Sequence, residues 1–253
     1  DQATPIASAE ILEQLEQIRQ LVQASNYSLY LPALESFIHK VRLFGTHFAF
    51  LDIRQDSRIH HQVLEDIHLT LRKKTGTGLF PSNYSKLSVS EQIALLETLE
   101  GNLDPSDFSE PLTRDTIETF YAIKKVQDLN GLAACHRYII SNAQSTLHVV
   151  ELMTLFRLCG WERSLSSIDI IPLFETITDL ENAEEIMQVL YSSSSYRGHL
   201  EQRQLKQTIM LGFSDGTKDG GYLQANWSIY KAKERLTSLS RKNGVEVLFF
   251  DGR

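Results

Sequence analysis

The stretch that decides the fold is Ile168-Asp169-Ile170-Ile171-Pro172-Leu173-Phe174-Glu175. It is short, apolar and rich in β-branched side chains, and it turns polar at its end, as a buried strand does where it emerges into a loop. Four other runs in the chain share this pattern: residues 48–54, 137–141, 208–215 and 245–253. Five buried strands are therefore predicted.

Helical segments separate these runs. Apolar side chains recur at helical spacing over residues 11–22 and 31–41. Further helices are predicted at 115–130, 145–159 and 224–243, each followed by a glycine that suits a left-handed C-terminal cap. Because strands and helices alternate, parallel βαβ units are the simplest arrangement.

Two capping boxes are also predicted, one from Ser88 with Glu91 and one from Thr178 with Glu181. Five strands are too few for a closed eight-stranded barrel. No helix follows the last run, which ends at Arg253, to cover its face. We therefore expect a helix-rich α/β fold, a partial (β/α) TIM-like barrel of about five parallel strands truncated from an eight-stranded barrel, with no internal domain boundary.

Composition limits the possible functions. The 253 residues are 42% hydrophobic and 23% charged, with a formal net charge of -7, which is typical of a globular protein. The chain lacks both a dense Lys/Arg stripe and a run of roughly 18 apolar residues, so neither nucleic acid nor a membrane is an expected partner. Two cysteines, Cys135 and Cys159, cannot supply a disulfide framework or a thiolate zinc site. We expect a cytoplasmic protein, either an enzyme acting on a small molecule or an interaction domain.

Acidic residues follow two of the predicted strands. In parallel βα folds the active site forms at the carboxyl ends of the strands, where Glu175 and Asp215 would face one opening. Their hard carboxylate oxygens suit Mg²⁺ or Mn²⁺. Each acid could instead cap the helix that follows it. The presence of both acids opposite two arginines favours the metal site.

Those two arginines are Arg54 and Arg253. A guanidinium group can hold phosphate or carboxylate through paired hydrogen bonds. Either arginine could instead form a structural ion pair, and Asp52 and Asp56 are available to Arg54.

A glycine-rich segment, residues 212–221, follows the fourth predicted strand. Its spacing differs from that of a nucleotide-binding loop. We expect it to form a strand-to-helix turn whose amides, together with Lys218, meet an anion next to Asp215.

The strand ends resemble those of the phosphoenolpyruvate carboxylases, and they occur in the same order. Residues 50–57, Phe-Leu-Asp-Ile-Arg-Gln-Asp-Ser, resemble the family's L-D-I-R-Q-E-S segment. Residues 138–141 are similar to Y-[VI]-I-S, 172–180 to P-L-F-E-T-x-x-D-L, and 212–219 to G-Y-S-D-S-x-K-D. Asp56 replaces the family's Glu, and Asp251 replaces the His of F-H-G-R, which indicates a divergent branch.

The resemblance implies that residues 1–253 are a single fragment, the central part of the family's barrel domain. The implied parent enzyme carboxylates phosphoenolpyruvate with bicarbonate, giving oxaloacetate and phosphate, and depends on Mg²⁺ or Mn²⁺. It would be a cytoplasmic homo-oligomer, a tetramer in the family.

Site residues carry over one by one. Glu175 and Asp215 match metal ligands, Arg54 and Arg253 match phosphate-binding arginines, and Lys218 matches a lysine that attracts bicarbonate. The resemblance thus makes Arg54, Lys218 and Arg253 both catalytic and substrate-binding. The family's catalytic histidine and its glycine-rich closing loop lie outside the matched segment, so the fragment alone is expected to be inactive. The alternative is a non-catalytic interaction domain derived from this half of the barrel.

Overall fold

The computed structural model describes residues 6–25, 27–163 and 165–252. The chain forms two compact units. Unit 1 comprises Asp1–Leu51 and Ala122–His136, and unit 2 comprises Asp52–Tyr121 and Arg137–Arg253. Compact units can be parts of one domain, so a single fragment without an internal domain boundary stays a prediction.

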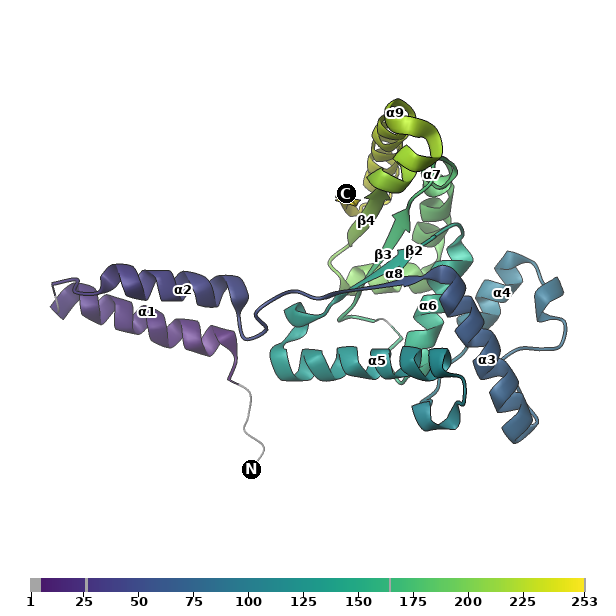
Figure 1. Cartoon of the computed structure of the whole chain (residues 1–253), viewed down its shortest axis with the longest axis horizontal. Helices are drawn as coiled ribbons and strands as arrows, with labels where there is room; N and C mark the ends of the chain where they lie inside the picture. The colour runs from purple at the N-terminus through teal and green to yellow at the C-terminus, as the bar shows by residue number, and fades with distance from the viewer. Residues whose placement is uncertain (1–5, 26, 164, 253) are drawn as a thin grey trace. The chain divides into compact units, whose positions relative to one another are not determined.

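Unit 1 contains two helices that contact each other, α1 (Ser8–Ser25) and α2 (Leu31–Phe44) (Figure 1). Both were predicted from the spacing of their apolar residues. Glu16 of α1 accepts hydrogen bonds from Arg19 and from Arg42 of α2, so charged side chains join the two helices. The second segment of unit 1 carries the end of α5 (Pro111–Asn130) and the short 3₁₀-helix η3 (Leu132–Ala134).

A parallel sheet of five strands forms the centre of unit 2, in the order β1-β2-β3-β4-β5. The strands are β1 (Asp52–Asp56), β2 (Arg137–Ser141), β3 (Asp169–Phe174), β4 (Lys206–Gly212) and β5 (Glu246–Gly252). Every neighbouring pair is parallel, so all the carboxyl ends lie along one edge. Sequential order with intervening helices is the arrangement of a (β/α) barrel. The sheet is not closed within the described residues, and the predicted partial barrel is confirmed.

Helices fill the intervals between the strands (Figure 1). They are α3 (Ser57–Thr75), α4 (Val89–Leu96), α6 (Thr146–Leu158), α7 (Ile177–Ser192), α8 (Ser194–Gln202) and α9 (Phe213–Lys242), with the 3₁₀-helices η1 (Tyr84–Lys86) and η2 (Pro105–Asp107). The central helix of this layer is α6, which contacts α3, α4 and α7 and is buried from Val149 to Leu158. In the described part of the chain, no helix has both the length and the apolar content needed to cross a membrane.

One face of the sheet carries a small apolar core. Arg54, Ile139 and Ile171 lie level in register, so their side chains point to the same face. Ile139 and Ile171 form a buried cluster with Leu173 and Met210. Arg54 is the charged residue at the β1 end of this face, and it is therefore placed to reach the carboxyl edge of the neighbouring strands.

The first strand begins later than predicted. Residues 48–54 were expected to form it, but β1 is Asp52–Asp56. Phe48 has a φ of 63° and is 79% exposed, and strand residues do not adopt that left-handed conformation. The polar residues Gln55 and Asp56 pair in register with Ile140 and Ser141 of β2. Backbone pairing with a neighbour, which side-chain polarity does not reveal, sets the bounds of this strand.

Two capping boxes and a glycine-rich turn were predicted at helix starts, and the structure confirms only the first box. The capping box of Ser88 with Glu91 is confirmed. The second box was placed wrongly, because it is formed by Thr176 with Asp179, two residues earlier. The glycine-rich segment is also not the predicted turn: α9 begins at Phe213, and its helical conformation is interrupted only at Gly221, where φ is 79°. The segment is therefore helical on both sides of a kink at Gly221, and only that glycine breaks the helix.

Candidate active site

Arg54 and Glu175 form an ion pair at the carboxyl edge of the sheet. Arg54 Nη2 donates to Glu175 Oε1 at 2.7 Å. Arg54 lies on β1 and Glu175 directly follows β3, so the pair reaches across β2. The side chain of Arg54 is 49% exposed and that of Glu175 is 18% exposed. A pair so accessible to water contributes about 1 kcal/mol or less, so a charged ligand can open it at little energetic cost.

The suggested local partners of Arg54 are engaged elsewhere. Asp56 caps α3 by accepting a hydrogen bond from the Arg58 amide, and it also pairs with the Arg58 side chain at 2.6 Å. The hydrogen bond from the Arg58 side chain lowers the pKa of Asp56. Asp52 lies 3.5 Å from Arg137. The alternative prediction, that Arg54 pairs with Asp52 or Asp56, is therefore wrong. Arg54 pairs with Glu175 instead.

The end of β2 orients the Glu175 carboxylate. The backbone amide of Asn142 donates to Glu175 Oε2 at 3.1 Å. Asn142 has a φ of 56°, a conformation that asparagine tolerates better than most residues. Ser57 Oγ donates to the Asn142 carbonyl at 2.8 Å, which ties this turn to the start of α3. Both carboxylate oxygens of Glu175 thus have a donor.

Gly212 lets the chain at the start of α9 approach Glu175 closely. A Cβ added at Gly212 would lie 2.9 Å from the Glu175 Cα, a distance at which the backbone has to move. A Cβ at Gly216 would lie 3.4 Å from the Glu175 carbonyl oxygen. Glu175 therefore lies directly against the first turn of α9, which carries Asp215.

Asp215 pairs with the lysine one helical turn later. Lys218 Nζ donates to Asp215 Oδ1 at 3.0 Å, and the two side chains are 77% and 49% exposed. Neither strand-end acid is an N-cap: Gly212 occupies that position of α9, and Thr176 caps α7. The capping alternative is therefore wrong for both Glu175 and Asp215.

The donor chemistry of Glu175 and Asp215 suits a hard divalent cation. Each carboxylate is balanced by one cation, Arg54 or Lys218. Across residues 6–25, 27–163 and 165–252, no group of three or more His, Cys, Asp or Glu side chains is arranged to hold a metal ion, so any ion bound here would need water or substrate oxygens as further ligands. The fifth predicted site residue, Arg253, lies outside the described residues. Sharing of one ion by the two acids stays a prediction.

Three contributors to the site were not assigned a role from the sequence. They are the Asn142 amide, the close approach at Gly212, and Asp179, whose carboxylate accepts hydrogen bonds from the amides of Glu175 and Thr176 at 3.3 and 2.9 Å. A signal for Asp179 was present, since it lies three residues after Thr176, the spacing of a capping box. The other two depend on contacts between separate strands, which have no local pattern.

Comparison with known proteins identifies similar sequences over nearly the whole chain. The family model described as phosphoenolpyruvate carboxylase matches residues 2–253. The phosphoenolpyruvate carboxylase of Gloeobacter violaceus is 32% identical over 251 residues, which is 96% of this chain and 26% of that protein. That of Nitrosomonas europaea is 37% identical over 262 residues, 99% of this chain and 27% of that protein. The chain thus spans about a quarter of the length of these relatives.

Proposed function

Because this chain belongs to the phosphoenolpyruvate carboxylase family, we propose that it carries the strand-end part of an active site that converts phosphoenolpyruvate and bicarbonate to oxaloacetate and phosphate. The observation that carries the proposal is the pairing of Arg54 with Glu175 at 2.7 Å, on the sheet edge where Asp215 and Lys218 also lie. Residues of these types at this edge suit an anionic substrate together with a divalent cation.

The charges of these four residues support an exchange of partners on binding. Two acids and two cations neutralise one another in this structure. Phosphoenolpyruvate and bicarbonate are anions, and they attract Arg54 and Lys218 away from the acids. Glu175 and Asp215 are then left with uncompensated negative charge, which favours a divalent cation beside them. Substrate and metal would therefore promote each other's binding.

Glu175 and Asp215 would hold Mg²⁺ or Mn²⁺, which would supply positive charge that stabilises the pyruvate enolate. The planar fork of Arg54 suits two oxygens of the phosphoryl group, whose charge spreads during transfer to bicarbonate. Lys218 is a compact charge on a flexible stem, which suits the attraction of bicarbonate. The Asn142 amide keeps Glu175 oriented when Arg54 leaves it.

Exclusion of water is the part of the reaction that this chain does not supply by itself. Carboxyphosphate, the product of phosphoryl transfer, is readily hydrolysed, and the side chains of Arg54 and Lys218 are 49% and 77% exposed. Catalytic groups that act together lose function together. We therefore expect the isolated chain to make no oxaloacetate, although the complete enzyme would.

A metal titration of the chain tests the proposed site. Mn²⁺ binding is measured by electron paramagnetic resonance in the wild type, Glu175→Gln and Asp215→Asn, with Glu185→Gln as a matched control on the exposed side of α7. We expect the two site variants to bind Mn²⁺ about tenfold more weakly, because each loses one carboxylate charge, and the control to match the wild type. Equal binding in all four proteins would contradict the metal site.

An activity assay tests the expected inactivity of the chain. The chain is supplied with phosphoenolpyruvate, bicarbonate and Mg²⁺, and oxaloacetate is detected by coupling to malate dehydrogenase. We expect a rate no higher than that of Glu175→Gln. A wild-type rate above that variant would show that the chain already encloses its substrate.

A further inference from the structure

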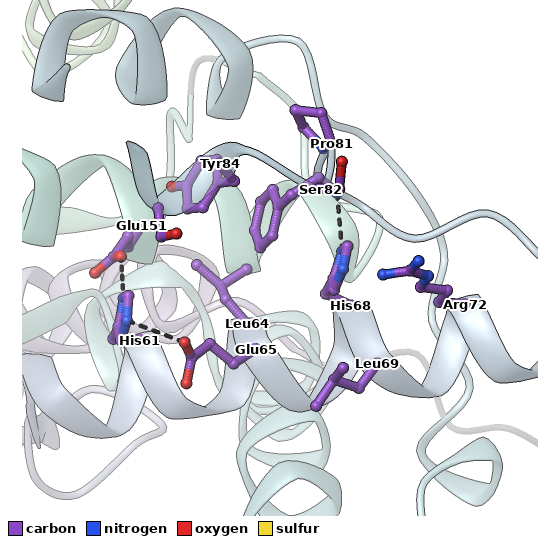
Figure 2. Close-up of a pocket in the computed structure, with 12 residues that line it drawn as sticks. His61, Leu64, Glu65, His68, Leu69, Arg72, Pro81, Ser82, Tyr84 and Glu151 are labelled. Atoms are coloured by element: carbon purple, nitrogen blue, oxygen red, sulfur yellow. Dashed lines mark hydrogen bonds and ion pairs between the residues drawn. The ribbon is translucent and has the colours of Figure 1, made fainter. Parts of the chain in front are cut away.

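A pocket lies between α3 and the loop at residues 80–85, and none of the residues that line it belongs to the strand-end site (Figure 2). Its volume is 280 Å³, slightly below the range of pockets that hold drug-sized ligands. Successive turns of α3 form the floor of the pocket, the loop forms its wall, and Glu151 of α6 closes one end. The pocket is therefore sized for a small group.

The closed end holds two buried polar atoms without a partner. Glu151 is 1% exposed, and its Oε1 lies 2.7 Å from His61 Nδ1. Its other oxygen, Oε2, has no hydrogen-bond partner among the described residues, and the same is true of the buried Tyr84 hydroxyl. Figure 2 shows Tyr84 and Glu151 at the same end of the pocket. A buried carboxylate oxygen without a donor is energetically costly, so this end calls for a ligand that donates hydrogen bonds.

The same end is negatively charged. His61 contacts two acids, since its Nε2 also lies 3.6 Å from Glu65 Oε1. The hydrogen bond to Glu151 raises the pKa of His61. Even when His61 is protonated, two carboxylates against one imidazolium leave one negative charge in excess. No three of the described His, Cys, Asp or Glu side chains form a metal-binding group here, so the missing charge is better supplied by an organic cation.

The middle of the pocket is apolar and partly aromatic. Leu64 lines the floor and is 2% exposed. The rings of Phe80 and Tyr84 stack with centroids 4.2 Å apart, and His68 stacks on Phe80 at 5.2 Å. These walls suit a short hydrocarbon chain next to the charged head.

The far end of the pocket rules out one class of ligand. Arg72 lies there (Figure 2), eleven residues after His61 on α3 and thus about 16 Å away along the helix axis. An α-amino acid carries its ammonium and carboxylate on one carbon, so it cannot contact both ends. The acidic end therefore binds its ligand without help from Arg72.

We propose that this pocket binds a primary alkylammonium group, carried either by a small amine or by a lysine side chain. Both acceptor atoms are buried, so the ammonium donates hydrogen bonds to Glu151 Oε2 and to the Tyr84 hydroxyl oxygen once these side chains rotate toward the pocket. The alkyl chain lies against Leu64 and Phe80. This site is separate from the proposed carboxylation site and does not depend on that assignment.

The test is a ligand titration of the chain in which binding is measured by saturation-transfer NMR. n-Butylammonium is compared with butan-1-ol, a neutral molecule of nearly the same shape, and with Nα-acetyl-lysine amide. We expect n-butylammonium to bind the wild type about tenfold more tightly than the alcohol, since hydrogen bonds to a charged group are the stronger ones. Tighter binding of the lysine derivative than of n-butylammonium would identify a lysine side chain of a protein as the natural occupant. Tighter binding of n-butylammonium would identify a free amine.

Two variants and one control locate the binding site. Glu151→Gln keeps the volume of the side chain and removes its charge, and Tyr84→Phe removes only a hydroxyl group. Both should weaken n-butylammonium binding, the first about tenfold, while Glu185→Gln on α7 should leave it unchanged. If the circular dichroism spectrum of Glu151→Gln shows that this variant does not fold, the Tyr84→Phe variant and the comparison with butan-1-ol test the proposal instead. The proposal would be overturned if neither ammonium compound showed saturable binding, or if butan-1-ol bound as tightly as n-butylammonium. It would also be overturned if Tyr84→Phe and Glu151→Gln bound n-butylammonium as tightly as the wild type does.

Discussion

Acidification should destabilise the fold through His60, which is fully buried on α3. Its Nε2 bonds with the Tyr138 hydroxyl at 2.9 Å, and its Nδ1 has no hydrogen-bond partner among the described residues. Burial lowers the pKa of His60 from 6.5 to about 4; the charge of Asp56 opposes this change, and that of His148 adds to it. The ring is therefore neutral in the folded chain at pH 7.

The sign and the size of the effect follow from this pKa. Between pH 6.5 and about 4 the unfolded chain binds a proton at His60 and the folded chain does not. The stabilisation is therefore complete above pH 6.5 and is lost as the pH falls toward 4. With 1.36 kcal/mol per pKa unit, the loss is about 3 kcal/mol. His61 has a raised pKa, and its contribution has the opposite sign, since it is lost as the pH rises.

Comparison with His60→Gln separates the two histidines. A glutamine amide can still form a hydrogen bond with Tyr138 but does not titrate. The contribution of this side chain to the free energy of unfolding is therefore independent of pH in the variant. Urea unfolding followed by circular dichroism between pH 7.5 and 4.5 gives the free energy of unfolding of each protein. We expect the wild type to lose about 2 to 3 kcal/mol more than His60→Gln over this range, and a variant of the exposed His39, His39→Gln, to behave like the wild type. Parallel curves for the wild type and His60→Gln would refute the argument.

Three other changes probe the site and the core. Gly212→Ala should lower the free energy of unfolding by about 1 to 3 kcal/mol in urea, because its Cβ would lie 2.9 Å from a backbone atom of Glu175, whereas Gly216→Ala, with 3.4 Å, should change it much less. In the complete enzyme, Asp215→Asn should depress oxaloacetate production in the coupled assay and weaken its dependence on Mg²⁺; full activity at ordinary Mg²⁺ would show that Asp215 is not a ligand. Arg157→Met should lower the free energy of unfolding by about 2 to 4 kcal/mol in thermal or urea unfolding. The reason is that the buried guanidinium donates hydrogen bonds to the carbonyls of Leu96 and Leu99 and to the Thr154 hydroxyl. The control Arg241→Met, at an exposed position, should have little effect.

Much of the fold could be predicted from local patterns. Runs such as residues 168–175 are apolar over a strand length and are followed by a helix, so each βα unit is recognisable by itself. Parallel pairing then places every carboxyl end at one edge. This is why Arg54, Glu175, Asp215 and Lys218 could be assigned to the same edge of the sheet before any contact between them was known.

Contacts between distant segments were decided only by the tertiary structure. Arg54 has two acids within two residues of it in sequence, yet it pairs with Glu175, which is 121 positions away. Glu151 lies within an apolar helix, and only the packing of α6 beside α3 places its carboxylate against His61. The presence and type of most helices and strands follow from interactions within a few residues, which the sequence shows as periodicity. The partner of a charged side chain depends instead on which segments pack together and at what register, and no local pattern contains that information.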